Sequence, residues 1–124
     1  MRQSAMVAII DDDEQVRTAT ASLVRSLGLT VSTFASAEDF LSSPRRPDAA
    51  CVITDVQMPG MSGIELQEAL RADGFQTPLI FITAFPEERV RRQAAAGGAI
   101  GFLAKPFDGT EMIACLDHAL GGIA

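Results

Sequence analysis

A run of four acidic residues directly follows a short apolar stretch near the start of the chain. Asp11, Asp12, Asp13 and Glu14 come after "VAII" (7–10), which is typical of the middle of a buried strand. Neighbouring like charges repel, and partial burial makes each carboxylate harder to ionise. Carboxylates are ligands of hard divalent cations, and Mg²⁺ takes one or two of them while it keeps several waters and a substrate phosphate. We therefore expect a bound Mg²⁺ to offset the repulsion at this end of the strand.

Three further polar residues follow or end apolar runs: Asp55, Thr83 and Lys105. Asp55 lies in "CVITDVQMPGMSG", where an apolar run leads into a loop rich in Pro and Gly. An aspartate on such a support can attack phosphorus to form an aspartyl phosphate, provided that cations neutralise the transferring group. Mg²⁺ and the Lys105 ammonium would supply this charge from two sides. Thr83 offers a hydroxyl donor, and the small Ala84 leaves room for the phosphoryl group.

A structural interpretation competes for the acidic run. Aspartate is a good helix N-cap, and acids are favourable in the first turn of a helix. Capping explains Asp13 and Glu14 well. Taken singly, Lys105 resembles a solvated surface lysine and Thr83 an ordinary residue at a strand end. Capping does not explain why Asp55, Thr83 and Lys105 also lie where apolar runs end.

Five apolar runs of strand length alternate with helix-length segments, a pattern typical of α/β proteins. The runs are "MVAII" (6–10), "LTVSTF" (29–34), "ACVIT" (50–54), "PLIFIT" (78–83) and "IGFLA" (100–104). We expect a five-stranded parallel sheet with helices on both faces, in which the alternating run 29–34 suits an edge. In such sheets the functional site lies at the carboxyl ends of the strands, beside the point where the strand order reverses.

Helical periodicity predicts which side chains cover the sheet. The first helix has an apolar face and a stop signal, formed by Val16, Ala19, Leu23, Leu27 and Gly28. The last helix has an apolar face formed by Met112, Ile113, Leu116, Ala119 and Leu120. The stretch 86–96 offers only Val90, Ala94 and Ala95, so we expect it to be the least firmly packed helix.

Length and composition indicate one domain over residues 1–124. The net charge of -6 opposes a phosphate backbone, so we expect no direct nucleic-acid binding by this chain. No apolar run approaches the ~20 residues of a membrane span, and "MRQSAM" is too short and polar for a signal peptide, which predicts a cytoplasmic protein. Cys51 and Cys115 lack metal-ligand or redox spacing, so we interpret them as buried reduced thiols, and His118 as a surface residue.

The motifs together resemble the receiver domains of two-component response regulators. The matching stretches are "IIDDD", "TDVQMPGMSG", "FITA" and "GFLAKPF", and the resemblance covers nearly the whole chain. "TFASAEDFL", "MPGMSGIELQ" and "FLAKPF" further resemble the subgroup typified by nitrogen-fixation regulators. The resemblance implies the flavodoxin-like strand order 2-1-3-4-5, Mg²⁺ as cofactor, and a sensor histidine kinase as the partner that donates the phosphoryl group.

The resemblance also implies a role for individual residues. Asp55 would be the phosphoacceptor, Asp12 a direct Mg²⁺ ligand, Asp11 a ligand through water, and the Gln57 backbone carbonyl a further ligand. Thr83 and Lys105 would contact the phosphoryl group. The chain would catalyse only its own phosphorylation and a slow self-dephosphorylation, and so would not be an enzyme in the ordinary sense.

Two further residues acquire a meaning from the resemblance. Pro106 would follow a cis peptide bond. Phe102 matches the family's switch aromatic, whose ring turns inward as Thr83 moves toward the phosphoryl oxygen, although ordinary core packing is the alternative. The local charge would thereby change the surface formed by the fourth helix, fifth strand and fifth helix.

Phe85 bears on the lifetime of the phosphoryl group. Gln57 and Phe85 would flank the path of an attacking water, and Phe85 can shield this path but cannot activate the water. We therefore expect slow self-dephosphorylation. The loop "TAFPEE" departs from the Gly/His-containing loop common in the subgroup, which affects the expected loop conformation rather than the chemistry.

Charged residues late in the chain suggest an interface. The predicted fourth helix carries Arg89, Arg91 and Arg92, and the fifth carries Glu111 and Asp117. Solvated charges worth little singly are one interpretation. A phosphorylation-dependent homodimer, with Arg–acid pairs across a two-fold axis, is the sharper hypothesis.

Two other functions compete with the phosphoryl-accepting switch. A Mg²⁺-dependent phosphohydrolase of the haloacid-dehalogenase type would need a second Asp two residues after the nucleophile, where this chain has Gln57. A constitutive interaction module with a vestigial site is the other. The chain ends at "GGIA", which leaves open a stand-alone regulator or a piece of a longer protein with a downstream, DNA-binding output domain.

Overall fold

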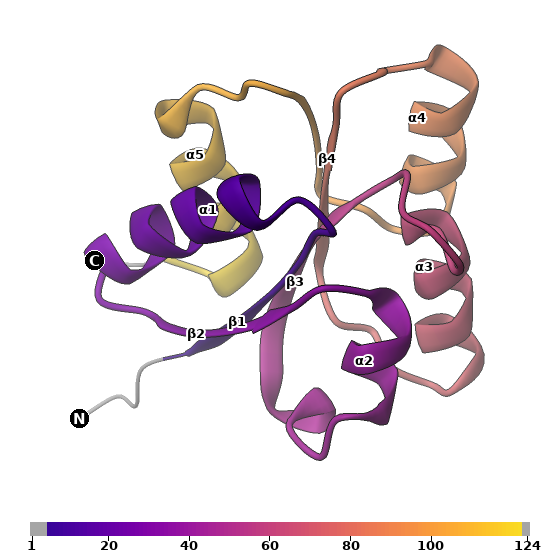
Figure 1. Cartoon of the computed structure of the whole chain (residues 1–124), viewed down its shortest axis with the longest axis horizontal. Helices are drawn as coiled ribbons and strands as arrows, with labels where there is room; N and C mark the ends of the chain where they lie inside the picture. The colour runs from indigo at the N-terminus through magenta and orange to yellow at the C-terminus, as the bar shows by residue number, and fades with distance from the viewer. Residues whose placement is uncertain (1–4, 123–124) are drawn as a thin grey trace.

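The computed structural model describes residues 5–122, which form a parallel sheet between two layers of helices (Figure 1). Strands and helices alternate throughout, with one 3₁₀ turn, Arg46–Asp48, before the third strand. The strands are β1 (Met6–Ile10), β2 (Thr30–Phe34), β3 (Ala49–Asp55), β4 (Leu79–Thr83) and β5 (Gly101–Ala104). The helices are α1 (Glu14–Ser26), α2 (Ala37–Ser42), α3 (Gly63–Ala72), α4 (Glu88–Ala96) and α5 (Gly109–Leu120).

The five strands are parallel and lie in the order β2-β1-β3-β4-β5, which confirms the predicted fold. All five residues of β1 and of β4 are buried, as expected of central strands covered on both faces. β2 lies at one edge and is partly exposed, as its alternating pattern predicts. The third strand extends one residue further than predicted, so Asp55 is its last residue rather than the first of the loop.

Two apolar clusters fill the space on the two faces of the sheet. One packs β1, β3 and β4 against α2, α3 and α4, and includes Phe40, Leu66 and Phe81. The other packs the opposite face against α1 and α5, and includes Val24 and Met112. Figure 1 shows α1 and α5 together on one side of the sheet and α2, α3 and α4 on the other. This is the predicted arrangement of helices on both faces.

The apolar faces of the helices differ in detail from the prediction. In α1 the buried residues are Thr20, Ala21 and Val24, whereas Ala19 is exposed. In α5, Met112 and Leu116 are buried as predicted, but Ile113 is 36% exposed. The pattern identified the helices correctly, but their rotation against the sheet depends on packing with neighbours far away in the sequence.

The α4 helix is packed as loosely as predicted. Ala94 is its one buried residue, Val90 is half-buried, and Ala95 is exposed, contrary to its predicted place on the apolar face. The arginines of α4 contact acids close by in the sequence: Arg91 and Arg92 pair with Glu88, and Arg89 lies 4.0 Å from Glu87.

Both thiols are free, with Cys51 buried and Cys115 half-buried, so the prediction of two buried thiols holds fully only for Cys51. Burial, with the neighbouring Cys115, raises the pKa of Cys51 to about 12, which keeps it a protonated thiol. His118 is exposed, as predicted. Within residues 5–122, no helix is both long enough and apolar enough to cross a membrane.

Candidate functional site

The ends of four strands bring the predicted site residues together. Asp55 ends β3 and is paired in register with Ile82, and Thr83 ends β4. The backbone N–H of Lys105 donates to the carbonyl of Thr83 at 2.8 Å, which ties the loop after β5 to the end of β4. Asp11 directly follows β1, and its N–H donates to the Phe34 carbonyl at 3.1 Å. The sheet itself therefore holds these residues at its carboxyl edge.

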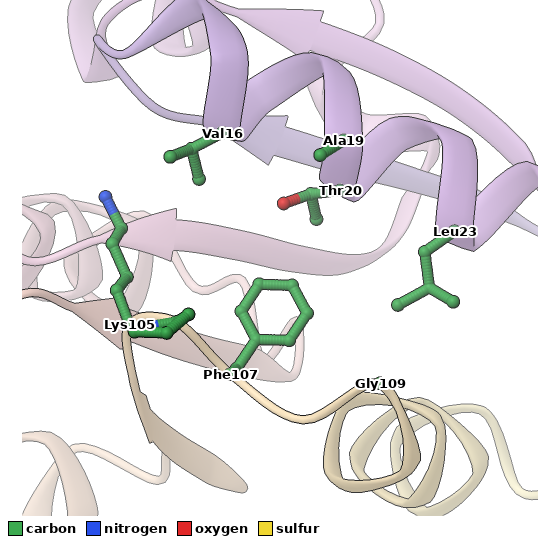
Figure 2. Close-up of a pocket in the computed structure, with 8 residues that line it drawn as sticks. Val16, Ala19, Thr20, Leu23, Lys105, Phe107 and Gly109 are labelled. Atoms are coloured by element: carbon green, nitrogen blue, oxygen red, sulfur yellow. The ribbon is translucent and has the colours of Figure 1, made fainter.

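Lys105 bridges two carboxylates at this edge. Its Nζ lies 3.0 Å from Asp11 Oδ2 and 3.1 Å from Asp55 Oδ2. The side chains are 15% (Lys105), 0% (Asp11) and 9% (Asp55) exposed, so these ion pairs are largely shielded from water. Figure 2 shows the Lys105 side chain extending from the loop after β5 toward α1. Three groups that come from distant parts of the sequence thus form one charged cluster.

The cluster affects the ionisation of its members. Burial raises the pKa of the Asp55 carboxyl above its ordinary value; Lys105 opposes this rise and Asp11 adds to it. Burial alone would lower the pKa of Lys105, but its contacts with Asp11 and Asp55 outweigh burial and raise that pKa above its ordinary value. Lys105 is therefore held as an ammonium ion at neutral pH, and ionised Asp55 carries a free-energy cost.

Three carboxylates are close enough to share a metal ion. One oxygen each of Asp11, Asp12 and Asp55 lies within 4.8 Å of the others. Asp12 is exposed, and Asp11 is fully buried with its Oδ1 accepting from the Asp13 N–H at 2.9 Å. Hard oxygen ligands in this number suit Mg²⁺ or Ca²⁺, so the donor set fits the expected cation.

Asp13 is a helix cap, as the competing interpretation predicts. Its Oδ1 accepts from the backbone N–H groups of Gln15 at 2.9 Å and Val16 at 3.3 Å, and Glu14 lies in the first turn of α1. The four acidic residues therefore have two different roles. Asp13 and Glu14 serve the helix, whereas Asp11 and Asp12 face the cluster with Asp55.

The loop after β3 is held close beneath Asp55. The Gln57 N–H donates to Asp55 Oδ1 at 3.3 Å, and the Gly63 N–H donates to the Val56 carbonyl at 2.8 Å. A Cβ on Gly63 would lie 2.3 Å from the Asp55 carbonyl oxygen, so α3 can start here only with glycine. The role of the Gln57 carbonyl as a metal ligand stays a prediction.

Thr83 and Phe85 form the other wall of the site. Thr83 is 1% exposed, and its Oγ1 accepts from the Phe85 N–H at 3.1 Å. Phe85 is 67% exposed. Its role in shielding the phosphoryl group from water stays a prediction.

Phe102 and Pro106 lie on either side of Lys105 in the sequence. The Phe102 ring is half-buried, with its centroid 6.3 Å from that of Phe81, and it lines a cavity of about 250 Å³ next to α4. The Lys105–Pro106 peptide bond is cis. The switching role of Phe102 stays a prediction.

Two residues that the sequence did not single out also hold the site. The Arg17 Nη1 donates to the Asp11 carbonyl at 2.7 Å. Glu38 Oε2 accepts from the Met61 N–H at 2.9 Å, which ties α2 to the loop after β3. Both are charged residues near helix starts, a signal too common to identify them in advance.

A groove of about 510 Å³ opens beside Lys105 (Figure 2). One wall is the face of α1 that carries Val16, Ala19, Thr20 and Leu23, and the other is the loop from Lys105 to Gly109. Figure 2 shows Thr20 facing the ring of Phe107 across this groove. The buried Thr20 hydroxyl has no hydrogen-bond partner within residues 5–122. The predicted apolar face of α1 thus partly lines this groove.

The fold and the cluster together define a flavodoxin-like α/β domain with an acidic, lysine-bridged site at the carboxyl edge of its sheet. The chain belongs to the response regulator receiver domains of two-component systems, because the model of that family matches residues 7–117. The predicted family resemblance is confirmed.

Individual relatives support the predicted subgroup. The chain is 40% identical over 118 residues to response regulator protein TodT of Pseudomonas putida, covering 95% of this chain and 52% of TodT. It is 40% identical over 121 residues to the transcriptional regulatory protein FixJ of Azorhizobium caulinodans, covering 98% and 57% of the two chains. The solved structure of FixJ-N superposes with a TM-score of 0.85 at 34% identity, covering 98% and 96%. The chain spans about half the length of the curated relatives it matches.

Proposed function

We propose that this chain is a phosphorylation-activated switch in which Asp55 accepts a phosphoryl group from a sensor histidine kinase. The Lys105 ammonium, 3.0 Å from Asp11 and 3.1 Å from Asp55, is the observation that carries this proposal. It places a fixed positive charge beside a carboxylate whose pKa is raised by burial, at the edge of a metal-sized acidic cluster. The direct test is Mg²⁺-dependent addition of one phosphoryl group to Asp55 from acetyl phosphate.

In the proposed reaction an Asp55 carboxylate oxygen attacks phosphorus. The new P–O bond forms as the bond from phosphorus to the donor histidine nitrogen breaks, and the nitrogen keeps the electron pair. Lys105 turns its ammonium toward the transferred oxygens, and Thr83 donates its O–H to another of them. A Mg²⁺ ion held by Asp11, Asp12, Asp55 and the Gln57 carbonyl would supply further positive charge against the phosphoryl oxygens.

The switch would pass from Thr83 to Phe102. A Thr83 hydroxyl that turns toward the phosphoryl group releases the Phe85 N–H, to which it is bonded at 3.1 Å, and so frees the loop before α4. The cavity of about 250 Å³ beside Phe102 gives that ring room to change position. The loose packing of α4, which buries only Ala94, keeps the cost of this movement low. The surface formed by α4, β5 and α5 would then carry the signal.

Asp12→Asn is expected to stabilise the metal-free protein and to remove most of the stabilisation that Mg²⁺ provides. Asp12 is exposed, one of its carboxylate oxygens lies within 4.8 Å of oxygens of Asp11 and Asp55, and it forms no ion pair within residues 5–122, so its charge adds repulsion. Loss of this charge should raise the free energy of unfolding by up to about 1 kcal/mol. Thermal melts with chelator and with Mg²⁺ measure both effects. A variant that melts lower without metal and still responds fully to Mg²⁺ would favour a purely structural role for Asp12.

The chain would catalyse only its own phosphorylation and a slow loss of the phosphoryl group, without turnover of a separate substrate. The structure offers no acid or base on the Phe85 side chain to activate water. Phe85→Glu should therefore speed the loss of phosphate by up to about 10²-fold, the lower end of what general base catalysis contributes, as followed by intact mass after removal of donor. Phe85→Leu, which keeps an apolar side chain, is the control. Equal rates for the Glu variant and the parent would reject this account.

The kinase is proposed to cover the groove between α1 and the loop after β5. Its phosphohistidine must reach Asp55, so its surface has to lie beside Lys105, where the apolar groove of about 510 Å³ begins. An arginine in place of the exposed Ala19 would obstruct this docking. Transfer from a purified, autophosphorylated kinase that phosphorylates the parent should slow at least about tenfold in Ala19→Arg.

Acetyl phosphate provides the internal control for this prediction, because a small donor needs no docking surface. Ala19→Arg should accept from acetyl phosphate at the parent rate. Thr18→Arg adds the same charge to an exposed position of α1 outside the groove and should accept normally from both donors. If the kinase transfers the phosphoryl group to both arginine variants at the same rate, the kinase does not dock on this groove.

The names of the matched relatives suggest which process the switch controls. Several matched proteins are named as transcriptional regulators, and they are about twice as long as this chain. We infer that this receiver controls a transcriptional output, carried by a separate domain or partner rather than by residues 1–124. The homodimer through α4 and α5 stays a prediction; Arg91 and Arg92 would have to exchange Glu88 of their own helix for acids of a second copy.

A further inference from the structure

Asp11 has a partner for each of its polar groups. Its N–H donates to the Phe34 carbonyl, its Oδ1 accepts from the Asp13 N–H at 2.9 Å, and its Oδ2 lies 3.0 Å from Lys105 Nζ. The remaining group, the backbone carbonyl, accepts a hydrogen bond from Arg17 Nη1 at 2.7 Å. Two of these partners are side chains: Lys105, which belongs to the charged cluster, and Arg17.

Arg17 contacts a backbone carbonyl although it lies beside an acidic cluster. Arg17 is the fourth residue of α1 and is half-buried, yet it forms no ion pair within 4.0 Å among residues 5–122. Its guanidinium donates instead to a backbone carbonyl. Hydrogen bonds from a charged donor are shorter and stronger than neutral ones. The arginine therefore fixes the backbone of the turn between β1 and α1 rather than neutralising its carboxylates.

The carbonyl held by Arg17 belongs to the peptide unit that joins Asp11 to Asp12. Because a peptide unit is planar, the direction of this carbonyl also sets the direction in which Asp12 leaves the turn. Asp12 is exposed, and its side chain has no hydrogen bond or ion pair among the contacts that residues 5–122 form. The position of its carboxylate near Asp11 and Asp55 thus depends on the backbone that carries it.

We propose that Arg17 is a positioning residue for the metal site: it holds the Asp11–Asp12 peptide so that Asp12 can join Asp11 and Asp55 around a divalent cation. This inference rests on the proposed function, because it assumes that the cluster binds Mg²⁺. Residues that orient metal ligands typically change metal affinity by about 10- to 100-fold when they are removed.

The sign of the effect separates positioning from electrostatics. Arg17→Gln removes one positive charge next to three carboxylates, so electrostatics alone predicts tighter Mg²⁺ binding. Positioning predicts weaker binding, by about tenfold or more. Arg17→Lys keeps the charge but not the planar donor group, so it should bind Mg²⁺ with an intermediate affinity. Arg25→Gln removes an exposed arginine from the last turn of the same helix and should bind Mg²⁺ as the parent does.

The experiment measures Mg²⁺ affinity by calorimetry and by the Mg²⁺-dependent shift in melting temperature, with no phosphodonor present. The Mg²⁺ concentration that half-saturates phosphorylation by acetyl phosphate is then compared with the rate at saturating Mg²⁺. We expect Arg17→Gln to raise the half-saturating Mg²⁺ concentration about tenfold. The rate at saturating Mg²⁺ should stay within about threefold of the parent rate, because Asp55, Thr83 and Lys105 are unchanged.

Binding of Mg²⁺ by Arg17→Gln as tight as, or tighter than, that of the parent would overturn the proposal. If this variant does not fold, Arg17→Lys decides: parent-like Mg²⁺ affinity in that variant would overturn the proposal, and weakened affinity would support it. A parent protein that binds Mg²⁺ but accepts no phosphoryl group would reject the proposed function while leaving the calorimetric comparison of Arg17 variants intact.

Discussion

Asp55→Asn is expected to abolish phosphoryl acceptance, lowering its rate with acetyl phosphate and Mg²⁺ by roughly 10³-fold or more. The amide has nearly the shape of the carboxylate but is a far weaker nucleophile, and no other carboxylate holds the same place at the end of β3. Intact mass spectrometry over time measures the effect. Asp39→Asn, which changes an exposed acid in the first turn of α2, is the matched control and should accept as the parent does.

The same variant carries an expected gain in stability. Burial raises the pKa of Asp55, with Lys105 opposing and Asp11 adding to the rise, so ionised Asp55 costs folding free energy above its folded-state pKa. Below the ordinary pKa of an aspartate, Asp55 is protonated in both states and this cost disappears. Asp55→Asn should therefore melt at a higher temperature than the parent at pH 7 in chelator, and the difference in melting temperature should shrink as the pH is lowered toward 4.

The acceptance prediction has its own contrary outcome. A phosphoryl adduct on the Asp55→Asn variant, formed at the parent rate, would show that the acceptor is another residue.

Lys105→Ala is expected to slow phosphoryl acceptance by roughly 10²-fold even at saturating Mg²⁺, because a fixed charge on the transferred oxygens is lost. It should also destabilise the metal-free protein by about 3–5 kcal/mol, since Asp11 and Asp55 then keep their largely buried charges without a partner. Mg²⁺ should restore much of this stability but not the rate. This separation of stability from rate is the signature of a residue that acts on the reacting group.

Two comparisons test the role of Lys105. Lys105→Arg keeps the charge in a wider, planar group and should recover stability better than rate. Chemical denaturation with and without Mg²⁺ gives the stabilities, and acetyl phosphate time courses give the rates. A Lys105→Ala protein that accepts phosphoryl groups at the parent rate would remove Lys105 from the mechanism and leave it only a structural counter-ion.

The sheet and the site could be predicted because their signals are local. Each apolar run marks a strand, and Asp55, Thr83 and Lys105 lie where such runs end, so parallel pairing alone brings them to one edge. The capping role of Asp13 is equally local, because it depends on the next three residues. These features needed no knowledge of side-chain packing.

Other features depend on contacts between distant segments and were missed. Ala19 is exposed because the loop from Lys105 to Gly109 leaves a groove beside α1 instead of covering its predicted apolar face. The contact of Glu38 with the Met61 N–H joins α2 to the loop after β3, and Arg17 reaches back to the Asp11 carbonyl. Helical periodicity shows that a residue faces one side of a helix, but not which atom of another element it meets.

The most direct test of the central claim is the intact mass of the parent protein during incubation with acetyl phosphate, with Mg²⁺ in one sample and chelator in the other. We predict that one phosphoryl group adds only with Mg²⁺, and that peptide mapping assigns it to Asp55. Mg²⁺ binding is measured independently by calorimetry. Two results would contradict the account. One is a protein that binds Mg²⁺ but gains no phosphoryl group, either from acetyl phosphate or from phosphorylated histidine kinases. The other is an adduct on a residue other than Asp55.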